Sequence, residues 1–160
     1  MRTLYKSEAM EKTKYYILLW LTGLFFIVSS CDKTQIAGKR FIKEGRWCVT
    51  ELTAGTTSFT KLPKWSISAC ENQEEYCTAI WEHQGGSTTT FFWKFYNIGG
   101  NFSLFVDPGE TDTGTMAYSQ CRNFSGVYKV IENNRNGFQF ESEESVGYPG
   151  KLVKIVLTAQ

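Results

Sequence analysis

Cysteine and histidine are the residues of this 160-residue chain best suited to chemistry, and it has five cysteines but only one histidine. With His83 alone, the chain cannot build a zinc site from several histidines, and any catalytic triad would have to use that residue. His83 follows Glu82 and precedes Gly85-Gly86, and no nucleophile stands beside them. We therefore expect a surface histidine, no catalytic residue, no metal and no cofactor, in a protein that is not an enzyme.

The cysteine at position 31 ends a segment with the pattern of an export signal. Basic residues precede an apolar run over residues 15–28, which leads into Ser29-Ser30-Cys31. As a helix, such a run of about fourteen residues spans roughly 21 Å, less than the roughly 30 Å hydrocarbon core of a bilayer. The segment is therefore typical of a cleaved signal peptide, with Met1 or Met10 as the initiator.

The sequence Val28-Ser29-Ser30-Cys31 resembles the bacterial lipobox. The resemblance implies that residues 1–30 are removed and that Cys31 carries diacylglycerol and a further acyl chain such as palmitate. Several acyl chains anchor a protein stably, whereas one binds only marginally. We expect a lipoprotein of the bacterial cell envelope. The outer membrane is favoured, and the sequence does not decide between its periplasmic and surface faces. An ordinary cleavage site followed by an unmodified Cys31 is the alternative.

Composition predicts one folded domain after this segment. Hydrophobic residues make up 42% of the chain and aromatic residues 16%, too much for a disordered chain. The 17 lysines and arginines nearly balance the 16 aspartates and glutamates, so the basic excess that nucleic-acid binding requires is missing. We expect a signal peptide over residues 1–30, a polar tether over 31–40 and a single domain over 41–160.

This domain alternates apolar and polar residues in short segments separated by turn residues, which is typical of β-strands. Short antiparallel strands joined by tight turns form a meander, and an eight-stranded meander can pair its edges by closing into a barrel. The sequence therefore predicts an all-β fold, an eight-stranded antiparallel meander closing into a barrel, with a possible short helix over 115–121. The predicted strands are 46–52, 65–69, 78–82, 88–96, 101–106, 126–132, 137–142 and 152–158.

Four cysteines remain in the mature chain, and an even number in an exported domain predicts two disulfides, with three possible pairings. Four buried thiols are the alternative. Cys70 and Cys77 flank a hairpin connection, so we expect them to be bonded to each other. That leaves Cys48 with Cys121, because barrel closure brings early and late strands together.

The tripeptide Gly45-Arg46-Trp47 resembles the Gly-x-Trp motif that opens the first strand of lipocalins. A lipobox, a polar tether, this motif and a Trp-rich meander with four cysteines together resemble the lipocalin-like lipoproteins of Bacteroidota, in the calycin barrel family, over about residues 38–158. The resemblance implies that Trp47 plugs the closed end of the barrel beneath Lys151 or Lys154. The chain departs from lipocalins by lacking a clear Thr-Asp-Tyr motif and a long helix after the barrel.

Phe91, Trp93 and Phe95 share one face of a predicted strand and form the candidate ligand-binding surface. Ordinary core packing is the alternative, because an eight-stranded barrel can be filled by its own side chains. The acidic loop over 107–114 lacks calcium-loop spacing, so we expect a solvated turn. We expect a protein that binds a small apolar molecule or lipid; the alternative is a protein-binding module or inhibitor of an envelope complex, its partner unknown.

Overall fold

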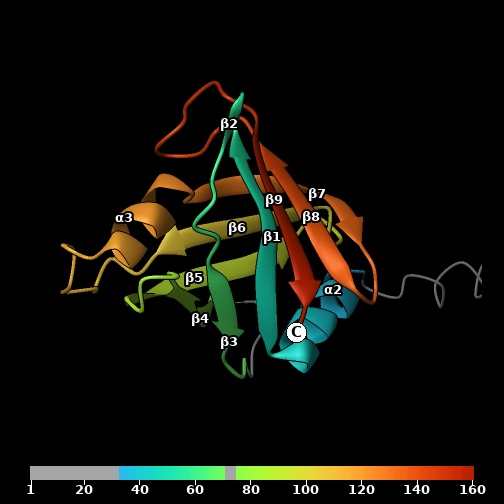
Figure 1. Cartoon of the computed structure of the whole chain (residues 1–160). Helices are drawn as coiled ribbons and strands as arrows, with labels where there is room; N and C mark the ends of the chain where they lie inside the picture. Colours follow the sequence, from blue (N-terminus) through green and yellow to red (C-terminus); the bar gives the residue numbers. More distant parts are fainter. Residues whose placement is uncertain (1–32, 71–74) are drawn as a thin grey trace, which may run out of the picture. The chain divides into compact units, whose positions relative to one another are not determined.

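The computed structural model describes residues 33–70 and 75–160 (Figure 1). The signal peptide predicted over residues 1–30 and the proposed lipid-attachment residue Cys31 lie outside these described residues. Neither of the helices within them is long and apolar enough to cross a bilayer.

In the described part of the chain, eight antiparallel strands close into a barrel, and a short extra strand pairs with the first of them. Each of the eight barrel strands pairs with the next barrel strand along the chain, and the first also pairs with the last, from Trp47 opposite Ala159 to Ala54 opposite Val153. The predicted meander and its closure are therefore confirmed. The strands are β1 (Arg46–Ala54), β2 (Thr57–Ser58), β3 (Lys64–Ile67), β4 (Cys77–Glu82), β5 (Thr88–Tyr96), β6 (Asn101–Val106), β7 (Gly126–Asn133), β8 (Gly137–Ser142) and β9 (Val153–Ala159); the helices are α2 (Lys33–Glu44) and α3 (Met116–Asn123).

Alternation along each strand decides which side chains enter the barrel. In β5 every second residue is buried, from Thr89 through Phe91 and Trp93 to Phe95, while the residues between them stay partly exposed. β8 and β9 show the same period. Because successive side chains of a strand point to opposite faces, the closed sheet gathers these residues into one core that is rich in aromatic rings.

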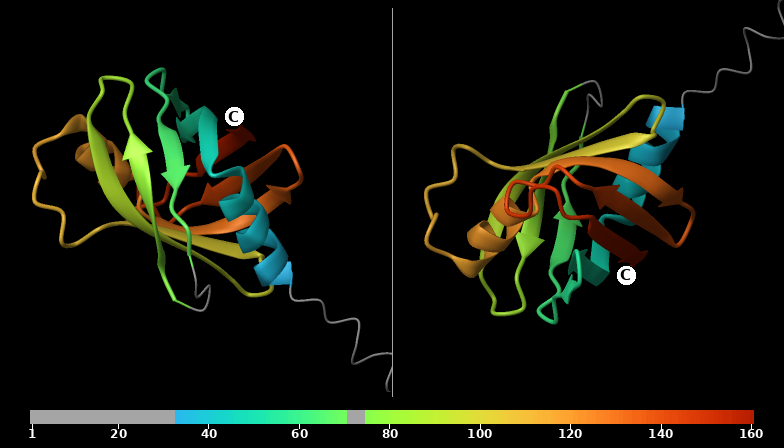
Figure 2. Two further views of the ribbon diagram at one scale, coloured as in Figure 1. Left: turned by 90° about the horizontal axis from the view of Figure 1, so that it is seen from below. Right: turned by 90° about the horizontal axis from the view of Figure 1, so that it is seen from above.

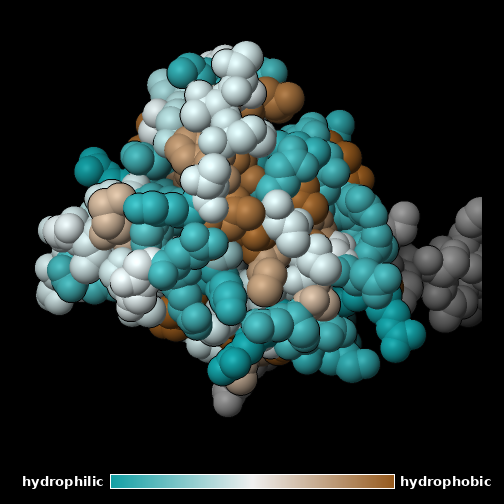
Figure 3. Space-filling view, in the orientation of Figure 1, coloured by the Kyte–Doolittle hydropathy of each residue, from teal (hydrophilic) through white to brown (hydrophobic). Residues whose placement is uncertain are grey.

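The outer face carries the polar residues of the same strands. On β1 and β9, Glu51 and Lys154 form an ion pair with 2.9 Å between the carboxylate oxygen and Nζ. On the side shown in Figure 3, hydrophilic residues border the hydrophobic residues that reach the surface. The barrel therefore follows the usual arrangement of an apolar interior and a mixed, mainly polar exterior.

Helix α2 corrects the predicted polar tether, because residues 33–40 belong to a helix that lies across one end of the barrel (Figure 2). Ala37 and Phe41, four residues apart on one helix face, are completely buried. Arg40 donates hydrogen bonds from Nη1 to the backbone and side-chain oxygens of Asn133 in β7. Gly45 ends the helix with φ +68°, a conformation that favours glycine, and leads directly into β1.

Helix α3 confirms the short helix expected over residues 115–121 and lies at the other end of the barrel (Figure 1). Thr115 caps it, because its side-chain oxygen accepts a hydrogen bond of 3.1 Å from the backbone N–H of Tyr118. Ala117 and Cys121 are its buried residues, and the helix packs against β4, β5 and β6. The two helices thus cover opposite ends of the barrel.

The cysteines are paired only in part as expected. Cys70 and Cys77 form a disulfide with 5.6 Å between their Cα atoms, which confirms the first pair. The predicted Cys48–Cys121 bond is wrong, because both residues are free thiols. Cys48 alternates with the inward-facing residues of β1 and so points out of the barrel, whereas Cys121 is buried on α3. Burial also raises the pKa of the Cys121 thiol.

Replacing Cys70 with alanine is expected to lower the free energy of unfolding by about 2 to 3 kcal/mol, because the disulfide closes a short loop in the unfolded chain. Urea unfolding followed by circular dichroism measures this loss. Cys48→Ala is the matched control, and we expect it to change stability by less than about 0.5 kcal/mol because its thiol is unbonded and faces outward. An equal loss in both variants would contradict the assignment of Cys48 as a free thiol.

Candidate functional site

The predicted ligand-binding residues face the barrel interior, where they pack against other rings. Phe91, Trp93 and Phe95 are 0%, 2% and 3% exposed. The ring centroid of Phe41 lies 4.9 Å from that of Trp93 and 5.6 Å from that of Phe95, and Phe102 lies 5.0 Å from Phe95. A ligand at this face would have to displace the Phe41 ring, so contact with a ligand stays a prediction for these three residues.

Trp47 of the Gly-x-Trp motif is fully buried at the end of the barrel covered by α2. Its indole N–H donates a hydrogen bond of 3.0 Å to the backbone oxygen of Phe41, and the two rings stack with 5.6 Å between centroids. The cover implied by the lipocalin resemblance is wrong, because Lys154 pairs with Glu51 on the outer face and the stem of Lys151 lies beside Gly55. The ring of Phe41 packs where a cation was expected.

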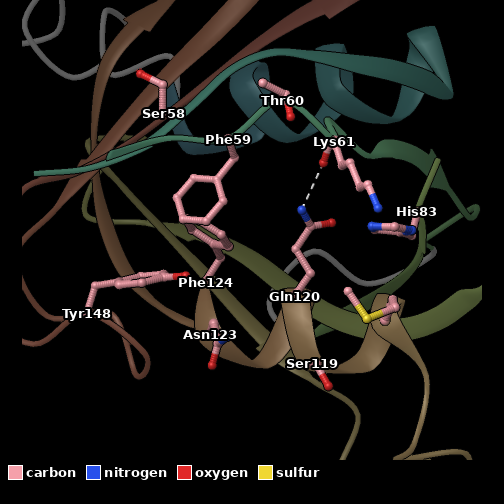
Figure 4. Close-up of a pocket in the computed structure, with 11 residues that line it drawn as sticks. Ser58, Phe59, Thr60, Lys61, His83, Ser119, Gln120, Asn123, Phe124 and Tyr148 are labelled. Atoms are coloured by element: carbon pink, nitrogen blue, oxygen red, sulfur yellow. Dashed lines mark hydrogen bonds between the residues drawn. The ribbon is translucent and has the colours of Figure 1, made fainter. Parts of the chain in front are cut away.

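A pocket of about 360 Å³ opens at the other end of the barrel (Figure 4). Loops alternate between the two ends of a meander, so the β2–β3 connection, the β4–β5 turn, α3 and the β8–β9 loop all meet at this mouth. We call this space the mouth pocket. Its lining residues are Ser58, Phe59, Thr60, Lys61, His83, Met116, Ser119, Gln120, Asn123, Phe124 and Tyr148.

Three aromatic rings form the apolar part of the mouth pocket. The ring of Phe59 stands edge-on to that of Phe124, with 5.2 Å between centroids, and Tyr148 lies 5.2 Å from Phe124 and 5.8 Å from Phe59. Phe124 is fully buried and stacks on Trp81, with 6.4 Å between centroids. The mouth pocket is therefore closed below by the barrel core.

Gln120 of α3 joins the mouth pocket to the barrel core. Its side-chain oxygen accepts a hydrogen bond of 3.1 Å from the indole N–H of Trp81, and its amide nitrogen donates one of 2.9 Å to the backbone oxygen of Lys61 (Figure 4). Both polar ends of the side chain are thus used. Gln120 holds the β2–β3 connection against α3 and so fixes the width of the pocket.

His83 is 6% exposed, so the expectation of a surface histidine is wrong. Its Nδ1 accepts a hydrogen bond of 3.0 Å from the backbone N–H of Gly85. A neutral imidazole that accepts at Nδ1 carries its proton on Nε2, which is therefore a hydrogen-bond donor. Within residues 33–70 and 75–160, no cluster of three or more His, Cys, Asp or Glu side chains could hold a metal ion.

Glu110 attaches the acidic loop over residues 107–114 to β5. Glu110 accepts hydrogen bonds from the backbone N–H of Thr90, at 3.1 Å, and from the hydroxyl of Thr89, at 3.2 Å. The hydrogen bond from the backbone N–H of Thr90 is the largest cause of a lowered pKa at Glu110, and the one from the backbone N–H of Asp112 is the next largest. This carboxylate holds the loop against the start of β5.

Sequence reasoning missed the mouth pocket because its aromatic residues lie outside the predicted strands. Phe59 lies in a segment expected to be a loop, Phe124 follows the short helix, and Tyr148 precedes the last strand. The sequence does contain a signal for this pocket. In a meander the loops of even and odd number gather at opposite ends, so aromatic residues in alternate loops share one mouth.

The strand pairings and the mouth pocket define a closed antiparallel β-barrel with an aromatic rim site. No protein-family model and no curated protein matches the chain. Among solved structures, the chain is similar to a lipocalin-like protein from Bacteroides uniformis, with 16% sequence identity and a TM-score of 0.48. The match covers 72% of this chain and 96% of that one.

Proposed function

We propose that this protein binds a small, mainly apolar molecule in the mouth pocket and holds it without chemical conversion. The single observation that carries the proposal is the pocket itself, about 360 Å³ in volume and walled by Phe59, Phe124 and Tyr148. Ligand sites in proteins commonly have volumes of about 300 to 1,000 Å³, combine apolar walls with a few polar groups, and occur in the mouths of β-barrels.

The mouth is favoured over the barrel interior for a packing reason. Entering the interior would separate rings that are already in contact, including Phe41 from Trp93 and Phe102 from Phe140, whose centroids are 4.9 and 4.4 Å apart. Each separated pair gives up about 0.5 to 1.5 kcal/mol beyond its buried area. A ligand in the mouth pocket covers the exposed surface of Phe59 and Tyr148 without breaking these contacts.

Binding of 2-naphthylmethanol, a compact neutral aromatic alcohol, tests the proposal by titration calorimetry on the purified full chain. Covering about 200 Å² of apolar surface supplies about 5 kcal/mol, which corresponds to a dissociation constant of about 0.2 mM, or weaker once association costs are subtracted. Phe59→Ala removes one wall of the pocket and is expected to weaken binding about five- to tenfold, because the ring contributes about 1 kcal/mol or more.

The matched control for this titration is Phe105→Ala on the outer face of β6, where the ring is 37% exposed and outside the pocket. We expect it to leave the affinity unchanged. Trp93→Phe, in the filled interior, is also expected to bind normally. No saturable heat from the unmodified chain would refute the proposal, and a loss confined to the Trp93 variant would move the ligand to the interior.

A protein-binding module is the second candidate function, and exposed apolar side chains on the outer faces of neighbouring strands favour it. Phe105 of β6 and Val127 of β7 are each 37% exposed, and Ile131 of β7 is 45% exposed. Such residues are ordinary singly and significant when they gather. Capture of one specific envelope protein that is lost in Phe105→Ser, from a chain that binds no apolar probe, would favour this candidate.

We also propose that the chain is anchored in the bacterial envelope through lipid on Cys31. The support is the order of the sequence, in which an apolar run over residues 15–28 is followed directly by Ser29-Ser30-Cys31. Anchoring would keep a ligand-binding barrel at a membrane, where small apolar molecules concentrate. The outer membrane is the membrane we favour.

A further inference from the structure

We infer that the mouth pocket selects a compact aromatic carboxylate, with the carboxylate bound between Lys61 and His83 and the ring held against the aromatic wall. The inference rests on the proposed function, because it assigns a chemical class to the ligand of the same pocket. Three features of the pocket carry it: its hydrogen-bond donors, its lack of acidic residues and its closed floor.

Two donors stand at one side of the mouth pocket. The Lys61 side chain extends toward His83 in Figure 4, and both residues line the pocket. The Nδ1 atom of His83 is occupied by the N–H of Gly85, which leaves Nε2–H as the donor of a side chain that is only 6% exposed. An ammonium group beside a second N–H donor is a suitable pair for the two oxygens of a carboxylate.

Nothing acidic competes for this pair within the pocket. None of its lining residues is an aspartate or a glutamate, and the ion pair found in the described part of the chain joins Lys154 to Glu51 on the outer face instead. The other polar groups of the lining are hydroxyls and amides, which are neutral. The charge of Lys61 is therefore available to an anionic ligand.

The closed floor of the mouth pocket limits the length and shape of the apolar part of the ligand. Phe124 is fully buried on Trp81, which in turn packs 5.4 Å from Trp65 in the core, so no channel continues below the pocket for a long chain. Phe59 and Tyr148 keep exposed ring surface above Phe124, and their centroids lie 5.8 Å apart, so a flat ring placed against them would meet their edges or their faces. Both arrangements are favourable for aromatic pairs.

The test compares 2-naphthoate with its neutral counterpart 2-naphthylmethanol and with the aliphatic carboxylate decanoate, by titration calorimetry on the full chain. We expect the naphthoate to bind about tenfold more tightly than the alcohol, and decanoate to bind more weakly than the naphthoate. Lys61→Met keeps the length of the side chain and removes its charge; it should abolish the tenfold preference, so that the variant binds the naphthoate no more tightly than it binds the alcohol. Lys64→Met, an exposed lysine of β3 outside the pocket, is the matched control and should retain the preference.

The outcomes separate the two proposals. Equal binding of the naphthoate and the alcohol overturns carboxylate selection and leaves the proposed function standing. Decanoate binding as tightly as the naphthoate overturns the choice of a compact ring. An equal loss of both naphthyl ligands in Lys61→Met would show that the side chain shapes the pocket and does not recognise charge, which also overturns the inference. If no probe binds, the proposed function fails as well.

Discussion

Replacing Phe41 with alanine is expected to lower the free energy of unfolding by about 3 to 5 kcal/mol. The ring is completely buried, and its centroid lies between 4.9 and 6.4 Å from those of six other rings. Alanine leaves a cavity at this point, and the neighbouring rings, each held on a strand of the closed barrel, can close in only partly. Urea unfolding of the full chain followed by circular dichroism measures the loss.

Ile36→Ala is the matched control on the same helix, because this side chain is 40% exposed. Alanine has a high helix propensity, so weakened helix formation would not explain a loss at either position. If Phe41→Ala fails to fold, Phe41→Leu keeps part of the volume and is expected to cost about 1 to 2 kcal/mol. A loss of less than about 0.5 kcal/mol in both Phe41 variants would contradict the packing of α2 into the barrel.

Replacing Cys31 with serine is expected to abolish lipid attachment, because only a thiol is alkylated with diacylglycerol in the lipobox that Val28-Ser29-Ser30-Cys31 resembles. Metabolic labelling with a fatty-acid analogue measures the effect. The unmodified chain should carry the label and fractionate with membranes, whereas the variant should carry none.

Cys48→Ser is the control for this experiment, since Cys48 is a free, partly exposed thiol in the barrel domain. It should be labelled as strongly as the unmodified chain. Equal labelling of Cys31→Ser and the unmodified chain would exclude Cys31 as the attachment site. An unlabelled but exported chain would instead support the alternative of an ordinary cleavage site.

The strands could be predicted from the sequence because their signal is local. Alternation needs only neighbouring residues, and three predicted ranges, 88–96, 101–106 and 137–142, agree with the bounds of β5, β6 and β8. The pairing of Cys70 with Cys77 was predictable for the same reason, since a short connection between two strands brings its ends together.

Helix α2 could not be predicted in this way. Ala37 and Phe41 are completely buried and Ile42 packs beside them, but an apolar stripe of three residues over two helical turns is a weak signal. A helix of twelve residues gains little stability from its own hydrogen bonds in water. Its helical state depends on an aromatic core whose rings come from strands far along the chain.

By itself, the sequence determined the all-β class, the order of the strands and the single local disulfide, because each depends on residues that are near one another in the chain. The tertiary structure decided the rest. Three features depend on how the sheet closes: the burial of Cys121 on α3 apart from the outward-facing Cys48, the filling of the interior by Phe41, and the meeting of Phe59, Phe124 and Tyr148 in one pocket. Closure brings together residues that are distant in sequence, and no local pattern records which of them become neighbours.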